Sequence, residues 1–126
     1  MKRVIIDTSS ILYGFSYNRN IFETLKSAFP EYRQLVSRGI INELTRLSAN
    51  RGAKGLRARV ALLELKAKKI NVDNISTYPD KWILNTAPKR KGTMVVTNDT
   101  VLARKLARSR VKVLKVSKSG LLKDFQ

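Results

Sequence analysis

The chain has 126 residues, of which 43% are hydrophobic and 28% are charged. This composition is typical of one folded domain with its own core. It contains neither cysteine nor histidine, which excludes disulfides, thiol catalysis, serine–histidine triads and histidine-ligated metals. Lys and Arg total 26 against nine Asp and Glu, giving a formal net charge of +17. This excess favours a polyanionic partner, most simply nucleic acid, over a membrane surface or a purely colloidal role.

No apolar run approaches the roughly 20 residues that a membrane span requires. The absence of cysteine agrees with a cytoplasmic location. We therefore expect a cytoplasmic protein with no membrane partner.

The first part of the chain predicts a strand, two helices and a second strand. Three β-branched residues indicate a buried strand over residues 1–6. Apolar residues recur with helical spacing over residues 10–29, with a break at 18–20 and a stop at Pro30. A weaker strand signal covers residues 32–36, and residues 37–39 have the composition of a turn.

The middle of the chain predicts two helices, a short strand and a third helix. The first helix covers residues 40–48, and a flexible basic loop follows at 50–55. The second covers residues 56–69 and is expected to bury one face, made of Leu56, Val60, Leu63 and Ala67. A short strand at 70–72 and a turn precede a helix that starts near Tyr78 and ends before Pro88.

The last part of the chain predicts a strand at 93–96, a helix at 99–110 and a strand at 111–116. The helix is expected to bury Val101, Leu102 and Leu106. The last strand alternates apolar and basic residues, which is typical of an edge strand guarded by lysines. Residues 117–126 are expected to form a tail. Strands alternating with helices predict a single α/β domain over residues 1–126, with a mostly parallel sheet covered on both faces.

Four of the nine acids stand where a strand has ended or a helix begins: Asp7, Glu43, Asp80 and Asp99. In a parallel α/β sheet such places share one edge, at the carboxyl ends of the strands. Each acid alone is more often a helix-start residue than a ligand. Together they repel one another, and a hard cation such as Mg²⁺ or Mn²⁺ removes that cost. Water bound to such a cation becomes a nucleophile near neutral pH, so histidine is not needed.

These four positions also carry a family resemblance. Residues 4–12 resemble the opening motif of PIN-domain ribonucleases, with the sequence VIIDTSSIL. Their second, third and fourth acidic motifs are similar to residues 41–44 (INEL), 80–87 (DKWILNTA) and 96–99 (VTND). The order is the same, and the likeness covers nearly the whole chain. The archaeal branch related to rRNA-processing PIN nucleases is the most similar, followed by toxin-type PIN proteins.

The resemblance implies a three-layer α/β/α sandwich around a central, mostly parallel sheet of about five strands. It implies a Mg²⁺- or Mn²⁺-dependent endoribonuclease that hydrolyses RNA phosphodiester bonds. The four acids would be its catalytic residues and metal ligands, with Thr8, Ser9 and Thr97 orienting them by hydrogen bonds. Two positions depart from the family pattern. Ser9 stands where many relatives carry Asn, and Asp80 is followed by Lys81 where many carry paired acids.

Basic residues around these motifs are expected to contact ribosomal or transfer RNA: Arg51, Lys54, Arg57, Lys81, Lys89, Arg90, Lys91, Arg104, Lys105 and Arg108. Two other functions stay open. One is a catalytically weak or inactive RNA-binding subunit in ribosome assembly. The other is the toxin of a toxin–antitoxin pair, whose partner would be an acidic protein. A homodimer is a further possibility, provided that the apolar face of Ile21, Phe22 and Leu25 is not used by the core.

Overall fold

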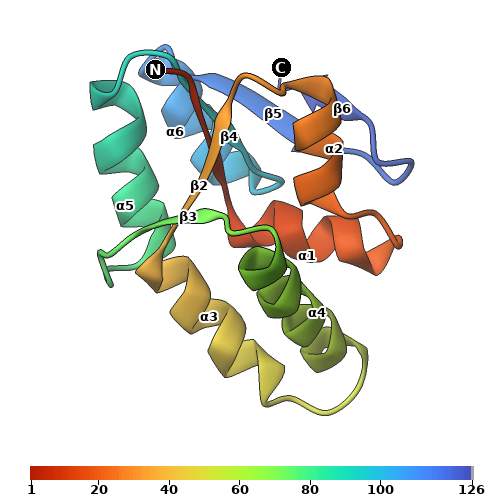
Figure 1. The fold of residues 1–126 in the computed structure, drawn as a ribbon. Coiled ribbons are helices and arrows are strands. Elements are labelled where there is room, and N and C mark those ends of the chain that lie inside the picture. The colour runs from red at the N-terminus through yellow and green to blue at the C-terminus, as the bar shows by residue number, and fades with distance from the viewer. Residues whose placement is uncertain (126) are drawn as a thin grey trace.

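A six-stranded sheet runs through the centre of the molecule in the order β3-β2-β1-β4-β5-β6. The computed structural model describes residues 1–125 (Figure 1). The strands are β1 (Arg3–Ile6), β2 (Arg33–Ser37), β3 (Asn71–Asp73), β4 (Thr93–Val96), β5 (Lys112–Val116) and β6 (Leu122–Asp124). Strands β1 to β5 are parallel to one another, and β6 pairs with β5 in the antiparallel direction. The predicted α/β fold with a mostly parallel sheet is confirmed.

Within residues 1–125, six α-helices connect the strands and cover the sheet. They are α1 (Thr8–Ser16), α2 (Ile21–Ala28), α3 (Arg38–Ser48), α4 (Ala53–Ala67), α5 (Pro79–Thr86) and α6 (Thr100–Arg108), with a short 3-10 turn, η1, at Ala87–Lys89. Helix α1 contacts α2, α3 and α4, α3 contacts α4, and α5 contacts α6. This grouping is what right-handed crossovers produce when the chain first moves to one edge of the sheet and then to the other. Figure 1 shows α3 and α4 as an antiparallel pair that extends beyond the end of β1.

The apolar residues of the two central strands, β1 and β4, form the most deeply buried part of the core. Val4, Ile5 and Ile6 of β1 have no exposed surface, and Val95 and Val96 of β4 have none either. Such continuous apolar runs are typical of strands that are buried on both faces. Ile21, Phe22 and Leu25 of α2 are also buried in this core. The apolar face of α2 that was considered for a homodimer therefore packs into the core of the same chain.

The carboxyl-terminal part of the chain differs from the prediction. Residues 122–124 form β6 instead of a tail, so the sheet has six strands and β5 is not its edge. A tight turn makes this possible: the backbone N–H of Ser117 donates to the carbonyl of Leu121 at 2.8 Å, and Gly120 takes a positive φ of 85°. The predicted tail also includes Gln126, which lies outside the described residues.

Helix α3 begins two residues earlier than predicted, so the expected turn at 37–39 is absent. Ser37 ends β2 and caps α3, because its hydroxyl accepts a hydrogen bond from the backbone N–H of Ile40 at 3.2 Å. A serine at this position stabilises a helix start directly after a strand.

The predicted buried face of α4 is wrong. Leu56 and Leu63 are 55% and 68% exposed, whereas the buried residues are Gly55, Ala58, Ala61 and Leu65. Helix α4 packs against α1 and α3, and three of its four buried residues, Gly55, Ala58 and Ala61, are small, which allows helices to approach closely. In α6, Val101 is likewise 60% exposed, and Ala103 is buried beside Leu102 and Leu106.

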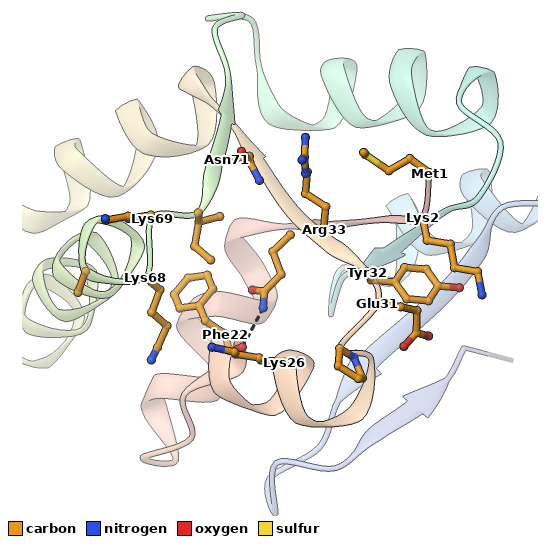
Figure 2. Close-up of a pocket in the computed structure, with 14 residues that line it drawn as sticks. Met1, Lys2, Phe22, Lys26, Glu31, Tyr32, Arg33, Lys68, Lys69 and Asn71 are labelled. Carbon is orange, nitrogen blue, oxygen red and sulfur yellow. Dashed lines mark hydrogen bonds between the residues drawn. The ribbon is translucent and has the colours of Figure 1, made fainter.

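At the amino ends of β1 and β2, the structure has a hollow of about 760 Å³. Figure 2 shows Lys2, Lys26 and Arg33 among the residues that line it. This hollow lies at the end of the parallel strands opposite to the four acids.

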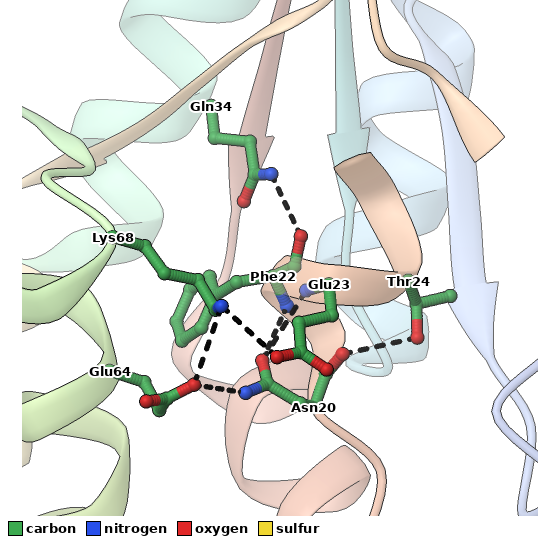
Figure 3. Close-up of polar contacts among 7 residues, drawn as sticks. All are labelled: Asn20, Phe22, Glu23, Thr24, Gln34, Glu64 and Lys68. Atoms are coloured by element: carbon green, nitrogen blue, oxygen red, sulfur yellow. Dashed lines mark hydrogen bonds and ion pairs between the residues drawn. The ribbon is translucent and has the colours of Figure 1, made fainter. Parts of the chain in front are cut away.

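A polar network next to this hollow joins α2 to α4 (Figure 3). The side chain of Asn20 accepts a hydrogen bond from the backbone N–H of Phe22 at 3.1 Å, and its amide donates to Glu64. Lys68 lies between Glu23, at 3.1 Å, and Glu64, at 3.8 Å. The Glu64–Lys68 contact joins residues four apart in α4, a spacing at which opposite charges stabilise a helix.

Candidate metal and nucleic-acid site

The first and fourth strands end just before Asp7 and Thr97, side by side in the sheet. Ile6 pairs with Val96, and the backbone N–H of Asp7 donates to the carbonyl of Val96 at 2.9 Å. The strand order reverses between β1 and β4, because β2 and β3 lie beyond β1 while β5 lies beyond β4. Such switch points, at the carboxyl ends of the strands, are where open α/β sheets bind ligands.

Asp7 occupies the N-cap position of α1, but its side chain makes no capping hydrogen bond. It is only 4% exposed. Its Oδ2 atom accepts hydrogen bonds from the hydroxyls of Ser9, at 2.6 Å, and Thr97, at 2.7 Å. Burial raises the pKa of Asp7, the two hydroxyl donors oppose that effect, and the charges of Asp80 and Glu43 raise the pKa further. A buried carboxylate held away from capping is available to a ligand.

Thr97 connects the loops that follow β1 and β4. It is 1% exposed, and besides donating to Asp7 its hydroxyl oxygen accepts from the backbone N–H of Asp99 at 3.1 Å. The hydroxyl of Ser9 lies 3.2 Å from that of Thr97 and accepts from the backbone N–H of Asn98 at 3.0 Å. Both hydroxyls therefore restrain the rotation of the Asp7 carboxylate.

Thr8 does not join this network. Its side chain is 5% exposed, and its hydroxyl has no hydrogen-bond partner within residues 1–125. Of the three hydroxyl residues expected to orient the acids, Ser9 and Thr97 contact Asp7, and Thr8 does not.

Asp80 and Glu43 approach the site from two helices. Asp80 is in the first turn of α5, and Glu43 is half-buried in the second turn of α3, because that helix begins at Arg38. Burial raises the pKa of Asp80, the charges of Asp99 and Glu43 raise it further, and Lys105 lowers it. The charges of Asp80 and Glu43 thus act on Asp7, and those of Asp99 and Glu43 act on Asp80, which is expected if the four carboxylates face one region.

Gly39 brings the two helices together. Its backbone N–H donates to the carbonyl of Ile75 at 3.1 Å, and the space that a Cβ atom would need is filled by the carbonyl of Thr77. The start of α3 therefore lies directly against the segment that leads into α5. Glu43 and Lys81 consequently line the same hollow, of about 440 Å³.

Asp99 is a helix cap and a member of the acid group at the same time. Its Oδ1 atom accepts from the backbone N–H groups of Val101, at 2.9 Å, and Leu102, at 3.1 Å. The same carboxylate raises the pKa of Asp80. Capping therefore explains part of the role of Asp99, whereas it explains none of the role of the Asp7 side chain.

The donor set fits a hard divalent cation. Within residues 1–125, no three Asp or Glu side chains are grouped tightly enough to hold a metal ion by themselves. Mg²⁺ usually binds one or two carboxylates and keeps several of its waters, so it does not need such a group. Asp7 and Asp80, whose pKa values are raised partly by the charges of neighbouring carboxylates, supply together with Glu43 and Asp99 the oxygen chemistry and the negative charge that this ion prefers.

The basic residues predicted to bind RNA have different surroundings. Arg90 forms an ion pair with Asp73 at 3.4 Å, and Asp73 also accepts from the indole of Trp82 at 3.1 Å. Lys105 lies near enough to Asp80 to lower its pKa. Arg57 is half-buried, and the remaining residues are exposed: Arg51, Lys54, Lys81, Lys89, Lys91, Arg104 and Arg108.

Sequence reasoning did not identify Ser10 and Asn98 as parts of the site. The hydroxyl of Ser10 donates to the side-chain oxygen of Asn98 at 2.7 Å. That oxygen accepts from the backbone N–H of Val116 at 3.1 Å, and the amide of Asn98 donates to the carbonyl of Val116 at 2.9 Å. The available signal was the position of Asn98, between Thr97 and Asp99.

Comparison with known proteins agrees with this architecture. Residues 4–118 match the PIN-like domain family. The chain therefore belongs to the PIN-like domain family, as the motifs predicted. No curated protein matches the chain in sequence.

Several solved structures share the fold, among them the following two. The structure of the PIN domain endonuclease Utp24 has 24% identity and a TM-score of 0.79, over 97% of this chain and 90% of that one. A domain of a functionally unknown protein from Methanocaldococcus jannaschii DSM 2661 has 18% identity and a TM-score of 0.62, over 93% of this chain and 92% of that one. At these identities the likeness shows the fold.

No helix within residues 1–125 is both long and apolar enough to cross a membrane.

Proposed function

We propose that this protein is a divalent-metal-dependent endoribonuclease that hydrolyses RNA phosphodiester bonds, with ribosomal RNA processing as its setting. The observation that carries the proposal is the buried Asp7 carboxylate. It accepts hydrogen bonds from Ser9 and Thr97, and the charges of Glu43 and Asp80 raise its pKa. Family membership and the shared fold with a PIN domain endonuclease support a nuclease function in general. The net charge of +17 supports a polyanionic substrate.

In this proposal Asp7, Glu43, Asp80 and Asp99 hold Mg²⁺ or Mn²⁺. When bound, the ion supplies a water of lowered pKa and offsets negative charge on the phosphate. Ser9 and Thr97 keep the Asp7 carboxylate in one orientation by donating to Oδ2. Lys81 and Lys105, beside Asp80, bind the phosphates that flank the bond to be cleaved.

A second candidate function is RNA binding without cleavage. Two observations favour it: a lysine follows Asp80 in the sequence, and residues 1–125 contain no ready-made group of three acids. This function predicts salt-sensitive RNA binding, no turnover, and little loss of binding after Asp80→Asn.

Cleavage of a structured RNA with added Mn²⁺ tests the proposal, using wild-type protein, Asp7→Asn and Glu31→Gln. We expect metal-dependent cleavage by the wild type and a loss of at least about 100-fold in Asp7→Asn, because the central carboxylate is removed. Glu31 is exposed and lies at the opposite end of the strands, so Glu31→Gln should cleave like the wild type. Equal cleavage by wild type and Asp7→Asn would refute the assigned site. Binding without cleavage by the wild type would favour the second candidate.

A further inference from the structure

Two lysines face each other across the β5–β6 hairpin. Lys115 of β5 is the direct register partner of Lys123 of β6, and both are exposed. Like charges directly opposite in an antiparallel pair destabilise it. No ion pair among residues 1–125 includes either lysine. Edge protection does not explain Lys115, because β6 covers β5.

The lysine pair lies next to the loop that carries Asp99. Lys115 and Lys123 line two hollows of about 440 and 640 Å³. The smaller hollow also contains Asn98, and the larger one contains Thr100. These two residues flank Asp99 in the chain, so the hairpin continues the surface of the acid site.

The hairpin is held firmly to that loop. The side chain of Asn98 forms hydrogen bonds with both the N–H and the carbonyl of Val116, at 3.1 and 2.9 Å, and accepts a third from Ser10. Asn98 therefore fixes the end of β5 relative to the acids, and the two lysines have a defined position with respect to Asp99.

Two more cations complete the surface. Arg104 of α6 lines the larger hollow, and Lys118 of the hairpin turn lines the smaller one. Asp124 contributes a carboxylate to the larger hollow, and the residues of 1–125 that line the smaller hollow include no carboxylate. Four cations facing one acid favour a ligand with regularly spaced negative charges.

Aromatic rings beside the smaller hollow favour RNA over an acidic protein. Tyr13 lines this hollow, and its ring centroid lies 5.1 Å from that of Tyr17. The ammonium group of Lys118 lies 5.9 Å from the centre of the Tyr17 ring. Cations that track a backbone, together with rings on which bases stack, are typical of single-stranded nucleic-acid binding.

We propose that Lys115, Lys123, Arg104 and Lys118 hold the phosphate backbone of the RNA strand where it extends away from the acid site. The phosphates neutralise the repulsion between the two facing lysines, and the adjacent bases stack on Tyr13 and Tyr17. This inference rests on the proposed function in taking RNA as the ligand, but it concerns binding rather than cleavage.

The test measures binding of fluorescent single-stranded RNA in EDTA, which keeps cleavage out of the experiment. The proteins are wild type and the double variant Lys115→Gln/Lys123→Gln. For RNA of about 20 nucleotides at ~0.1 M salt we expect roughly tenfold weaker binding. The dependence of log Kd on log salt should become shallower by about 1.4, since each contacted phosphate of a single strand contributes roughly 0.7.

A matched control removes two lysines from the hollow at the other end of the sheet, as Lys2→Gln/Lys26→Gln (Figure 2). It should keep most of the binding to the same RNA. Equal losses in both double variants would overturn the proposal, since net charge alone would then explain binding. Unchanged binding in Lys115→Gln/Lys123→Gln would also overturn it.

Two further measurements test the extent of the four-cation surface and the class of its ligand. The pair Arg104→Gln/Lys118→Gln leaves the facing lysines in place and should weaken binding of the same RNA as well; if it binds like the wild type, the four-cation surface is wrong. Polyglutamate of similar length should compete at least about tenfold less well than RNA. Equal competition would assign the surface to an acidic protein instead. Cleavage by the wild type is scored separately, so the proposed function and this inference can fail independently.

Discussion

The hydroxyl of Thr97 donates a hydrogen bond of 2.7 Å to the carboxylate of Asp7, which lies ninety residues earlier in the chain. Both side chains are nearly fully buried, at 1% and 4% exposed. This contact joins the loops after the two central strands, and it sets the orientation of the carboxylate on which the proposed chemistry depends.

Removal of that hydroxyl should impair both stability and cleavage. Thr97→Val keeps the shape of the side chain but leaves Asp7 with one hydroxyl donor fewer. Because hydrogen bonds to charged groups contribute about 1.5–3 kcal/mol, we expect the free energy of unfolding to fall by that amount in urea titrations. Cleavage should fall about 10- to 100-fold. Thr97→Ser, which retains a hydroxyl, is the control, and an unimpaired Thr97→Val would show that the contact does not support the site.

The raised pKa of Asp7 predicts a pH-dependent stability in the metal-free protein. Burial raises this pKa above the ordinary value of 3.8, so between the two values the folded protein binds more protons than the unfolded chain. The free energy of unfolding should therefore fall as the pH rises through this window. Asp80 contributes in the same direction.

Asp7→Asn removes the Asp7 contribution. In EDTA we expect this variant to show a smaller decrease in stability from acid to neutral pH, and to unfold at a higher temperature than the wild type near pH 7. Thermal unfolding monitored by circular dichroism at several pH values checks this. A wild type that becomes more stable over the same interval, with Asp7→Asn less stable at pH 7, would contradict it.

Asp99 allows capping to be separated from ligand binding. Asn caps helices about as well as Asp does, whereas Ala does not. Replacing the capping residue by Ala lowers the free energy of unfolding by about 1 kcal/mol. Asp99→Asn should therefore keep the stability of the wild type and lose cleavage, and Asp99→Ala should lose both. Urea unfolding and metal-dependent cleavage are measured side by side. Full activity in Asp99→Asn would mean that Asp99 is a cap and no more.

The register of α4 can be tested with two leucines. Leu65 is 6% exposed and Leu63 is 68% exposed. Leu65→Ala should lower the free energy of unfolding by about 2–5 kcal/mol. Leu63→Ala should change it by no more than about 0.5 kcal/mol. A large loss of stability in Leu63→Ala and a small one in Leu65→Ala would show that α4 buries the face predicted from the sequence.

Strong local signals explain why much of the fold could be predicted. The apolar run at residues 93–96 coincides with β4, and the break at 18–20 separates α1 from α2. Strand β6 was missed because three residues, Leu122–Asp124, carry no periodic pattern of their own and become a strand only by pairing with β5. The buried face of α4 was predicted wrongly because leucines outline one face of the helix, whereas the face that is buried in this helix, which packs against α1 and α3, carries mostly small residues.

The functional site, like the fold, could be predicted from the sequence only in part. The motifs pointed to Asp7 and Thr97, which the structure brings into contact. The hydrogen bond between Asn98 and Val116 depends on the order of the strands in the sheet. Lys115 and Lys123 face each other because β5 and β6 form a hairpin, for which the sequence carries no local signal. Both are long-range consequences of chain pairing, which local patterns do not contain.

The central claim is that the four acids together hold a catalytic divalent cation. A crystal structure of the wild type soaked with Mn²⁺ tests it most directly, because the anomalous signal of manganese marks the ion. We predict anomalous density at the carboxyl ends of β1 and β4, beside Asp7, and its loss in Asp7→Asn crystals soaked in the same way. Well-ordered acids without density in the wild type, or unchanged density in Asp7→Asn, would contradict it.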